Sequence, residues 1–171
     1  MLVVLLTPAK RRAQSRSDAP RVREQFLLFR VGEEIYGVGL RGLWEVLLPE
    51  GVTDLPTPPY QVCTALAYRG RRVPLIRMSE LFGVAAEGVP ASARVLLTQG
   101  QGRPLGLLVD EVLVVAEVDP ARIAPVPALA TLLNPRFFRG LFNRDGRVIL
   151  LVDEEGLAGF EQVVGFHAAA P

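Results

Sequence analysis

The chain has 171 residues, enough for one full domain or for two very small ones that share a core. Its formal net charge is +1, so no global field draws it to nucleic acid. Half of the residues are hydrophobic and the mean hydropathy is +0.29, yet no apolar run approaches the ~20 residues that span a bilayer. The surplus of apolar residues therefore fills a core, faces a partner protein, or does both.

Both ends of the chain differ in character from the middle. Residues 1–24 have no periodic apolar pattern and are predicted to be a disordered basic arm, and residues 161–171 a tail that carries His167. The apolar start at residues 1–6 is too short for a secretory signal, so a cytoplasmic location is expected. Cys63 is the only cysteine, which excludes an intrachain disulfide and a thiolate metal site.

The first half predicts short extended segments separated by turns. Strands are expected at residues 25–31, 35–40, 62–68 and 72–76, with a short helix at 79–82. Residues 43–47 form either a one-turn helix or a strand, because periodicity cannot decide over so short a run. Pro49, Pro56, Pro58 and Pro59 hold an extended connection before the hairpin that turns at Arg69-Gly70.

The second half repeats this pattern after a join rich in small residues at 85–92. Strands are expected at 94–98, 105–110, 112–118, 137–142 and 147–152, the last two joined across Asp145-Gly146. Asp153 is placed to cap a C-terminal helix with Leu157, Phe160 and Val164 on one face. Gly156 and Gly159 are expected to weaken that helix by about 1 kcal/mol each relative to alanine.

The sequence contains an internal repeat with a constant spacing between its two copies. Gly70, Leu75 and Leu81 return 76 residues later as Gly146, Leu151 and Leu157. Such spacing indicates two copies of one small β unit. The expected fold is all-β, with two packed five-stranded SH3-like barrels and short helices. The barrels are expected at about 25–84 and 93–153, and strands are free to cross over between them.

Motifs that would carry catalysis are not found. Gly100-Gln101-Gly102 lacks the Gly-Lys-Ser/Thr of a phosphate loop. The neighbours Asp110 and Glu111 point to opposite faces of a strand, so they cannot easily share one task. Ser79 and Ser92 have no histidine base, since residues 1–166 contain no histidine. The chain is therefore predicted to be neither an enzyme nor a holder of a metal or cofactor.

With the strands placed, residues 25–160 resemble the CheW-like domain, the coupling adaptor family of bacterial chemotaxis. The resemblance rests on the order of Phe26-Leu27-Leu28-Phe29, Gly32-Glu33-Glu34, Tyr36-Gly37-Val38, Leu43-Trp44-Glu45-Val46, Arg69-Gly70, Val73-Pro74-Leu75-Ile76 and Gly106-Leu107-Leu108-Val109-Asp110-Glu111-Val112. It implies two five-stranded barrels without catalysis. It also implies a scaffold that links the cytoplasmic tip of a chemoreceptor to the regulatory domain of a CheA-type sensor histidine kinase.

The resemblance also implies which residues bind partners and which proteins those partners are. The receptor-binding residues would be Leu43, Glu45, Arg69 and Gly70, in a groove between the barrels. The kinase-binding residues would be Val52, Thr53 and Leu55, at an edge of the first barrel. Other CheW-like domains are expected as partners within receptor arrays at the inner face of the membrane. Nucleic acid and direct membrane insertion are not expected.

Several residues depart from the family pattern. Thr64 occupies a position where the family pattern has glycine, and Ala67-Tyr68 occupies the position of its Asn-Leu pair. Arg77 occupies a position where the pattern has aspartate. These departures leave an alternative open: an accessory adaptor, as in frizzy-type gliding-motility systems, that binds receptor but has lost kinase docking. An unrelated enzyme or a nucleic-acid-binding barrel is a third reading, which the lack of histidine and the near-neutral charge disfavour.

Overall fold

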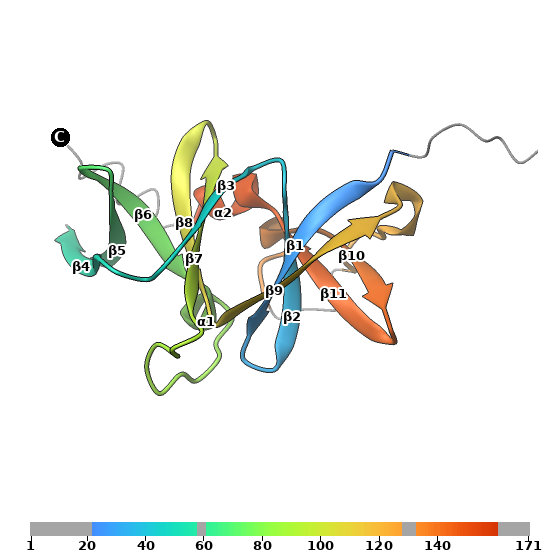
Figure 1. Ribbon diagram of the computed structural model, residues 1–171, viewed down its shortest axis with the longest axis horizontal. Helices are drawn as coiled ribbons and strands as arrows, with labels where there is room; N and C mark the ends of the chain where they lie inside the picture. Colours follow the sequence, from blue (N-terminus) through green and yellow to red (C-terminus); the bar gives the residue numbers. More distant parts are fainter. Residues whose placement is uncertain (1–21, 58–60, 128–132, 161–171) are drawn as a thin grey trace, which may run out of the picture.

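The computed structural model describes residues 22–57, 61–127 and 133–160, and these form two β-sheets with a few short helices (Figure 1). The strands are β1 (Glu24–Val31), β2 (Glu34–Gly39), β3 (Leu43–Leu47), β4 (Val52–Thr57), β5 (Gln61–Tyr68), β6 (Arg71–Arg77), β7 (Arg94–Gly100), β8 (Arg103–Val109), β9 (Glu111–Val118), β10 (Phe138–Arg144) and β11 (Arg147–Val152). The helices are α1 (Met78–Leu81) and α2 (Glu154–Ala158), with 3-10 turns η1 (Pro120–Arg122) and η2 (Pro135–Phe137). Residues 43–47 are thus a strand. Most of the predicted arm, the whole tail and His167 lie outside the described residues.

Each sheet is assembled from both halves of the chain. The first has the strand order β10-β11-β2-β1-β9 and the second the order β3-β7-β8-β6-β5-β4. The all-β class with two packed units is confirmed, but the hydrogen-bonded sheets are open instead of closed barrels, and the second has six strands. Strands β1 and β2 pair with strands of the second half, so the chain crosses over between the two units, which the predicted division had left open. Strands of opposite halves meet in two parallel pairs, β11 with β2 and β6 with β8, and in two antiparallel pairs, β1 with β9 and β3 with β7.

The repeat predicted from the 76-residue spacing is present as repeated topology. The order β10-β11-β2-β1-β9 has the same connectivity as β5-β6-β8-β7-β3, and β4 is an addition at one edge. Leu151 lies beside Gly37 across one parallel pair, and Leu75 lies beside Gly106 across the other. A Cβ added to Gly37 would lie 2.9 Å from Leu151 Cδ2, and one added to Gly106 would lie 3.3 Å from Leu75 Cδ1. Both units therefore use a glycine to admit the same repeated leucine.

The two repeated hairpins turn in the same way. Arg69 and Gly70 have φ angles of 47° and 75°, and Asp145 and Gly146 have φ angles of 53° and 79°. Two successive left-handed residues are the signature of a type I′ turn, whose twist matches that of the flanking strands. The predicted hairpin at Asp145-Gly146 and the one at Arg69-Gly70 are both confirmed.

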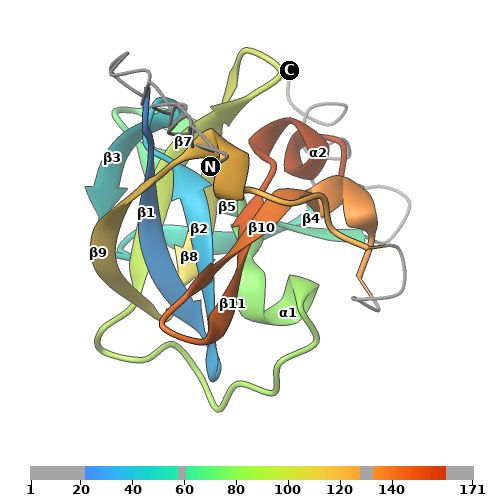
Figure 2. The same cartoon turned by 90° about the vertical axis from the view of Figure 1, so that its right-hand side faces the viewer.

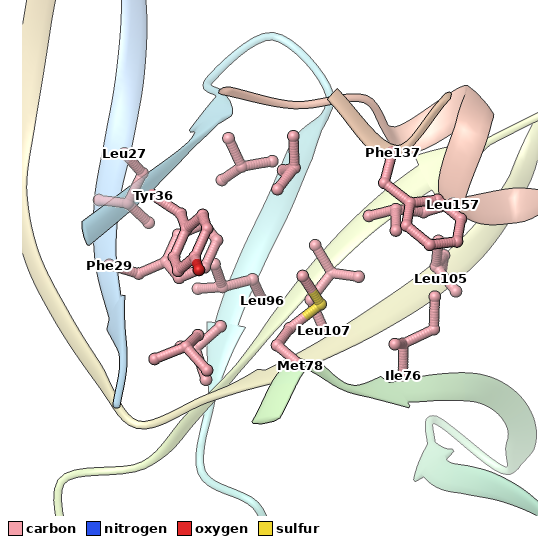
Figure 3. Close-up of a cluster of buried hydrophobic side chains, with 14 of the residues drawn as sticks. Leu27, Phe29, Tyr36, Ile76, Met78, Leu96, Leu105, Leu107, Phe137 and Leu157 are labelled. Atoms are coloured by element: carbon pink, nitrogen blue, oxygen red, sulfur yellow. The ribbon is translucent and has the colours of Figure 1, made fainter. Parts of the chain in front are cut away.

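The core has one central part and two smaller parts. The central core lies between the sheets (Figure 3) and contains Leu27, Phe29, Val31, Tyr36, Val38, Ile76, Met78, Leu96, Leu105, Leu107, Val109, Phe137, Phe138, Val152 and Leu157. The first sheet encloses its own cluster of Phe26, Leu28, Ala116, Val118, Phe142, Ile149 and Leu151. The second encloses Leu66, Leu75, Ala93, Val95 and Leu108. Neighbouring residues of β1 face different clusters, which explains why its apolar run is continuous instead of alternating.

Helix α2 is fixed to the rest of the molecule at its first turn. Asp153 caps it as predicted, since its Oδ1 accepts hydrogen bonds from the backbone N–H of Glu155 at 3.0 Å and of Gly156 at 3.4 Å. A Cβ added to Gly156 would collide with the backbone carbonyl oxygen of Arg136 in η2. Gly156 is therefore needed for close backbone approach, a reason for glycine that helix propensity does not reveal.

We expect Gly156→Ala to destabilise the protein by about 1–3 kcal/mol, although alanine is the better helix former, because the backbone of η2 would have to move. Gly159→Ala in the same helix is the matched control, because its added Cβ would be 3.4 Å from the nearest atom. The measurement is the free energy of unfolding in denaturant. Equal stability of the two variants would show that α2 and η2 are not held in contact.

A partly buried carboxylate, Glu154, lies beside the β2–β3 connection, one of the connections that link the two sheets. A Cβ added to Gly42, between β2 and β3, would lie 3.1 Å from Glu154 Oε1, and Thr98 Oγ1 donates a hydrogen bond of 2.8 Å to the Gly42 carbonyl. Burial is the main cause that raises the pKa of Glu154 above its ordinary 4.5, while Arg139 acts in the opposite direction. The folded protein therefore binds this proton more tightly than the unfolded chain does.

The sign of this shift gives a pH-dependent prediction. The stability that Glu154 contributes is fully present below its unfolded pKa and is lost as the pH rises through the raised folded pKa. We expect Glu154→Gln to raise the Tm at pH 7, by about 2–4 °C for each kcal/mol recovered, and to lose this advantage below about pH 4. Glu87→Gln, at an exposed position, is the control. A Tm difference that does not change with pH would contradict the prediction.

Candidate partner-binding site

The predicted receptor-binding residues come from strand β3 and from the β5–β6 turn, and β3 is not a neighbour of β5 or β6 in the sheet. Arg69 and Gly70 form the exposed turn between β5 and β6, and Glu45 lies on β3. Arg69 Nη2 is 3.5 Å from Glu45 Oε2, with side chains 76% and 42% exposed. Leu43, the fourth residue, is half-buried and packs against the central core, and a register shift separates it from Glu45. The fold therefore brings Glu45, Arg69 and Gly70 together and leaves Leu43 in a supporting position.

Tyr68 belongs to the same cluster. Its hydroxyl donates a hydrogen bond of 2.7 Å to Glu45 Oε2, and the Arg69 guanidinium carbon lies 5.0 Å from the centre of its ring. The hydrogen bond to Glu45 is the main cause that raises the pKa of Tyr68, followed by burial. From the sequence, Tyr68 stood out only as a departure from the family pattern. We call Glu45, Tyr68 and Arg69 the β3–β5 cluster.

Apolar side chains are exposed along two edge strands. Among the described residues, β3 pairs with β7 alone and β9 pairs with β1 alone. Strand β3 carries Trp44 and Val46, which are 51% and 42% exposed, and β9 carries Val115, which is 43% exposed. Val46 lies opposite Leu96, and Val115 opposite Leu27. Because opposite residues share a face and both leucines belong to the central core, both valines extend the apolar faces that enclose it.

These two edges lie on the same side of the molecule, as Figure 2 shows for β3 and β9. Trp44, Val46 and Val115 were not predicted from the sequence to be binding residues. Every residue from 43 to 48 except Glu45 is apolar, so the pattern alone could not tell which side chains remain exposed. Exposed apolar residues on two edges are typical of a surface that a partner covers.

The predicted kinase-binding residues all lie on β4, the last strand of the six-stranded sheet. Thr53 is exposed, whereas Val52 packs against the cluster around Leu66 and Leu55 packs against Ala65. Thr53 is thus the member of this set that offers the most side chain to a partner. Val52 and Leu55 anchor the strand.

Two of the departures from the family pattern meet at one acidic residue of β4. Thr64 Oγ1 donates a hydrogen bond of 2.9 Å to Asp54 Oδ1, and Arg77 Nη2 lies 3.3 Å from the same oxygen. Arg77 Nε is also 3.5 Å from Glu80 Oε1. The Arg77 side chain is only 22% exposed, so its charge is neutralised within the molecule instead of being presented at the surface.

The neighbouring acidic residues Asp110 and Glu111 have structural roles. Asp110 Oδ2 accepts a hydrogen bond of 2.7 Å from the backbone N–H of Gly32, and Glu111 forms a 2.9 Å ion pair with Arg30. Within the described part of the chain, His, Cys, Asp and Glu do not gather in a group of three or more that could hold a metal ion. In the same residues, no helix has the length and apolar character needed to cross a membrane.

Comparison with known proteins agrees with this geometry. A family model described as the CheW-like domain matches residues 25–162. The chain is 28% identical over 138 residues to the chemotaxis protein CheW of Rhizobium meliloti strain 1021, covering 81% of this chain and 89% of that relative. It is 28% identical over 142 residues to the chemotaxis protein CheW of Klebsiella aerogenes, covering 83% and 86%.

A solved structure shares the fold. The crystal structure of the scaffolding protein TtCheW from Thermoanaerobacter tengcongensis superposes with a TM-score of 0.72 at 25% sequence identity. The match covers 82% of this chain and 96% of that one, so it includes both sheets instead of one repeat. Because the family model spans most of the chain and the relatives match over nearly their whole length, the chain belongs to the CheW-like domain family.

Proposed function

We propose that this chain is a non-catalytic scaffold of bacterial chemosensory signalling, which links the cytoplasmic tip of a chemoreceptor to a CheA-type histidine kinase. Membership of the CheW-like family and the names of the relatives, chemotaxis protein and scaffolding protein, support the role. The two packed sheets support it too, since they offer separate edges to separate partners.

The β3–β5 cluster, beside apolar edge strands, is the observation that carries the proposed receptor contact. Glu45 and Arg69 supply charges of both signs, while Trp44, Val46 and Val115 supply apolar area. A helical receptor tip with an apolar stripe and flanking polar residues would match both features. In this proposal the apolar edges provide affinity and the charged cluster fixes orientation.

The edge strand β4 is the proposed kinase-docking site, through Thr53 with Val52 and Leu55 beneath it. The accessory-adaptor alternative rests chiefly on Arg77, a base where the family carries an acid. Because Asp54 and Glu80 surround Arg77, the reversal does not place a bare positive charge at this edge. We therefore favour an adaptor that retains kinase docking.

For the receptor contact, we expect Arg69→Ala to weaken binding of a receptor tip fragment by roughly fivefold or more, as for an arginine anchor in an interface. The Tm should stay within about 2 °C, because an exposed ion pair contributes little to stability. Arg72→Ala, an exposed arginine on the same hairpin, is the control for loss of charge alone. Equal binding by wild type and Arg69→Ala would remove Arg69 from the site.

For the kinase contact, we expect titration calorimetry to show micromolar binding of the wild type to the regulatory domain of a CheA-type kinase from the same organism. Thr53→Trp should abolish this binding, because a bulky side chain at an exposed edge position blocks close approach, and it should leave receptor binding unchanged. Val148→Trp is the control at an exposed position of β11. No kinase binding by the wild type would instead support the accessory-adaptor reading.

A further inference from the structure

We propose that Tyr68 is a positioning residue that holds Glu45 and Arg69 in the arrangement that the receptor contacts. The inference rests on the proposed function and adds a residue to it. The pattern of the resembled family places leucine at this position, which can neither donate a hydrogen bond nor stack against a guanidinium group. The role is therefore assigned to this chain and not carried over from its relatives.

The ring of Tyr68 is held in place by packing against buried apolar side chains. Tyr68 is the last residue of β5 and packs against the cluster that the second sheet encloses, which includes Leu66 and Val95. It also lies opposite Arg71 in the β5–β6 register, directly before the type I′ turn. The ring is thus fixed by the core and the backbone, while its hydroxyl reaches the surface. This combination of an apolar body and a polar end suits tyrosine.

The hydroxyl of Tyr68 joins two strands that the sheet keeps apart. In the order β3-β7-β8-β6-β5-β4, three strands separate β3 from β5. The hydrogen bond of 2.7 Å between Tyr68 and Glu45 therefore spans the open side of the curled sheet. Without it, the position of Glu45 relative to the β5–β6 turn would depend on the exposed ion pair with Arg69 at 3.5 Å. Such surface pairs are weak and cost side-chain entropy, so they hold long side chains poorly.

Arg69 is held by the same residue. Its φ of 47° lies in the left-handed region, and its guanidinium carbon is 5.0 Å from the centre of the Tyr68 ring while its side chain stays 76% exposed. Stacking on the ring and attraction to Glu45 Oε2 restrict a side chain that would otherwise sample many rotamers. A partner then loses less conformational entropy when it binds, which is the advantage of a pre-organised contact.

The binding experiment is a double-mutant cycle with a receptor tip fragment and the full chain. We expect Tyr68→Phe to weaken binding by about three- to tenfold, and to add no further loss when Glu45→Ala has already removed the acceptor. Tyr36→Phe is the matched control, since it removes a hydroxyl from the central core. Unchanged binding by Tyr68→Phe, or the same loss with and without Glu45→Ala, would overturn the inference.

A second measurement on the free protein separates this inference from the proposed function. We expect ¹⁵N relaxation of the Arg69 Nε–H group to show an ordered side chain in the wild type and a mobile one in Tyr68→Leu, which removes both ring and hydroxyl. An Arg69 side chain equally ordered in both proteins would overturn the inference, whatever the receptor does. An ordered Arg69 that depends on Tyr68, together with no receptor binding by the wild type, would contradict the proposed function and leave the positioning role standing.

Discussion

Burial of the central core between the two sheets is the constraint on which the rest of the structure depends. Each sheet is curled, so strands such as β1 bury one face against the partner sheet and the other within their own sheet. Phe29 and Val31 of the first sheet and Leu96 and Leu107 of the second are completely buried in this shared core. The sheets are therefore fixed relative to each other, and β3 and β9 are left as edge strands on one side of the molecule.

A closed barrel has no free strand edges, whereas an open sheet does, and the unpaired backbone groups of an edge strand promote association with other chains. An open sheet therefore needs a different way to protect its edges. Here side chains take over part of the role that hydrogen-bonded closure has in a barrel. Tyr68 and Glu45 bridge β5 and β3 in the second sheet, and Arg139 of β10 forms a 2.6 Å ion pair with Glu24 of β1 in the first. The bridge in the second sheet is also the proposed partner contact. Fold and binding are thus connected through the same residues.

The features predicted best from the sequence were those that depend on residues close together in the chain. The turns at Arg69-Gly70 and Asp145-Gly146 and the cap at Asp153 depend on neighbouring residues, and the structure has all of them. The repeated spacing extended these local features to a duplicated topology. The short apolar run at 43–47 stayed undecided, because strand pairing with β7, not propensity, makes it a strand.

What the sequence could not predict depends on long-range contacts. The parallel pairs β11–β2 and β6–β8 bring strands of opposite halves together, and no local pattern shows which strands cross over. Gly156 was interpreted as a weakness of a helix, but it permits contact with a backbone twenty residues earlier in the sequence. Tyr68 was noted only as a family departure, since its partner Glu45 lies on a strand that is not its neighbour. In each case the physical reason is packing between residues that no local pattern connects.

The most direct test of the proposed receptor site is a chemical-shift map of the ¹⁵N-labelled protein titrated with a receptor tip fragment. Backbone amides of β3, of the β5–β6 turn around Arg69 and of β9 near Val115 should shift together with a single affinity, while amides of β4 near Thr53 stay in place. Shifts centred on β4 or on the β10–β11 turn at Asp145, with β3 unchanged, would contradict the proposed site. That result would assign the β3–β5 cluster to the stability of the fold alone.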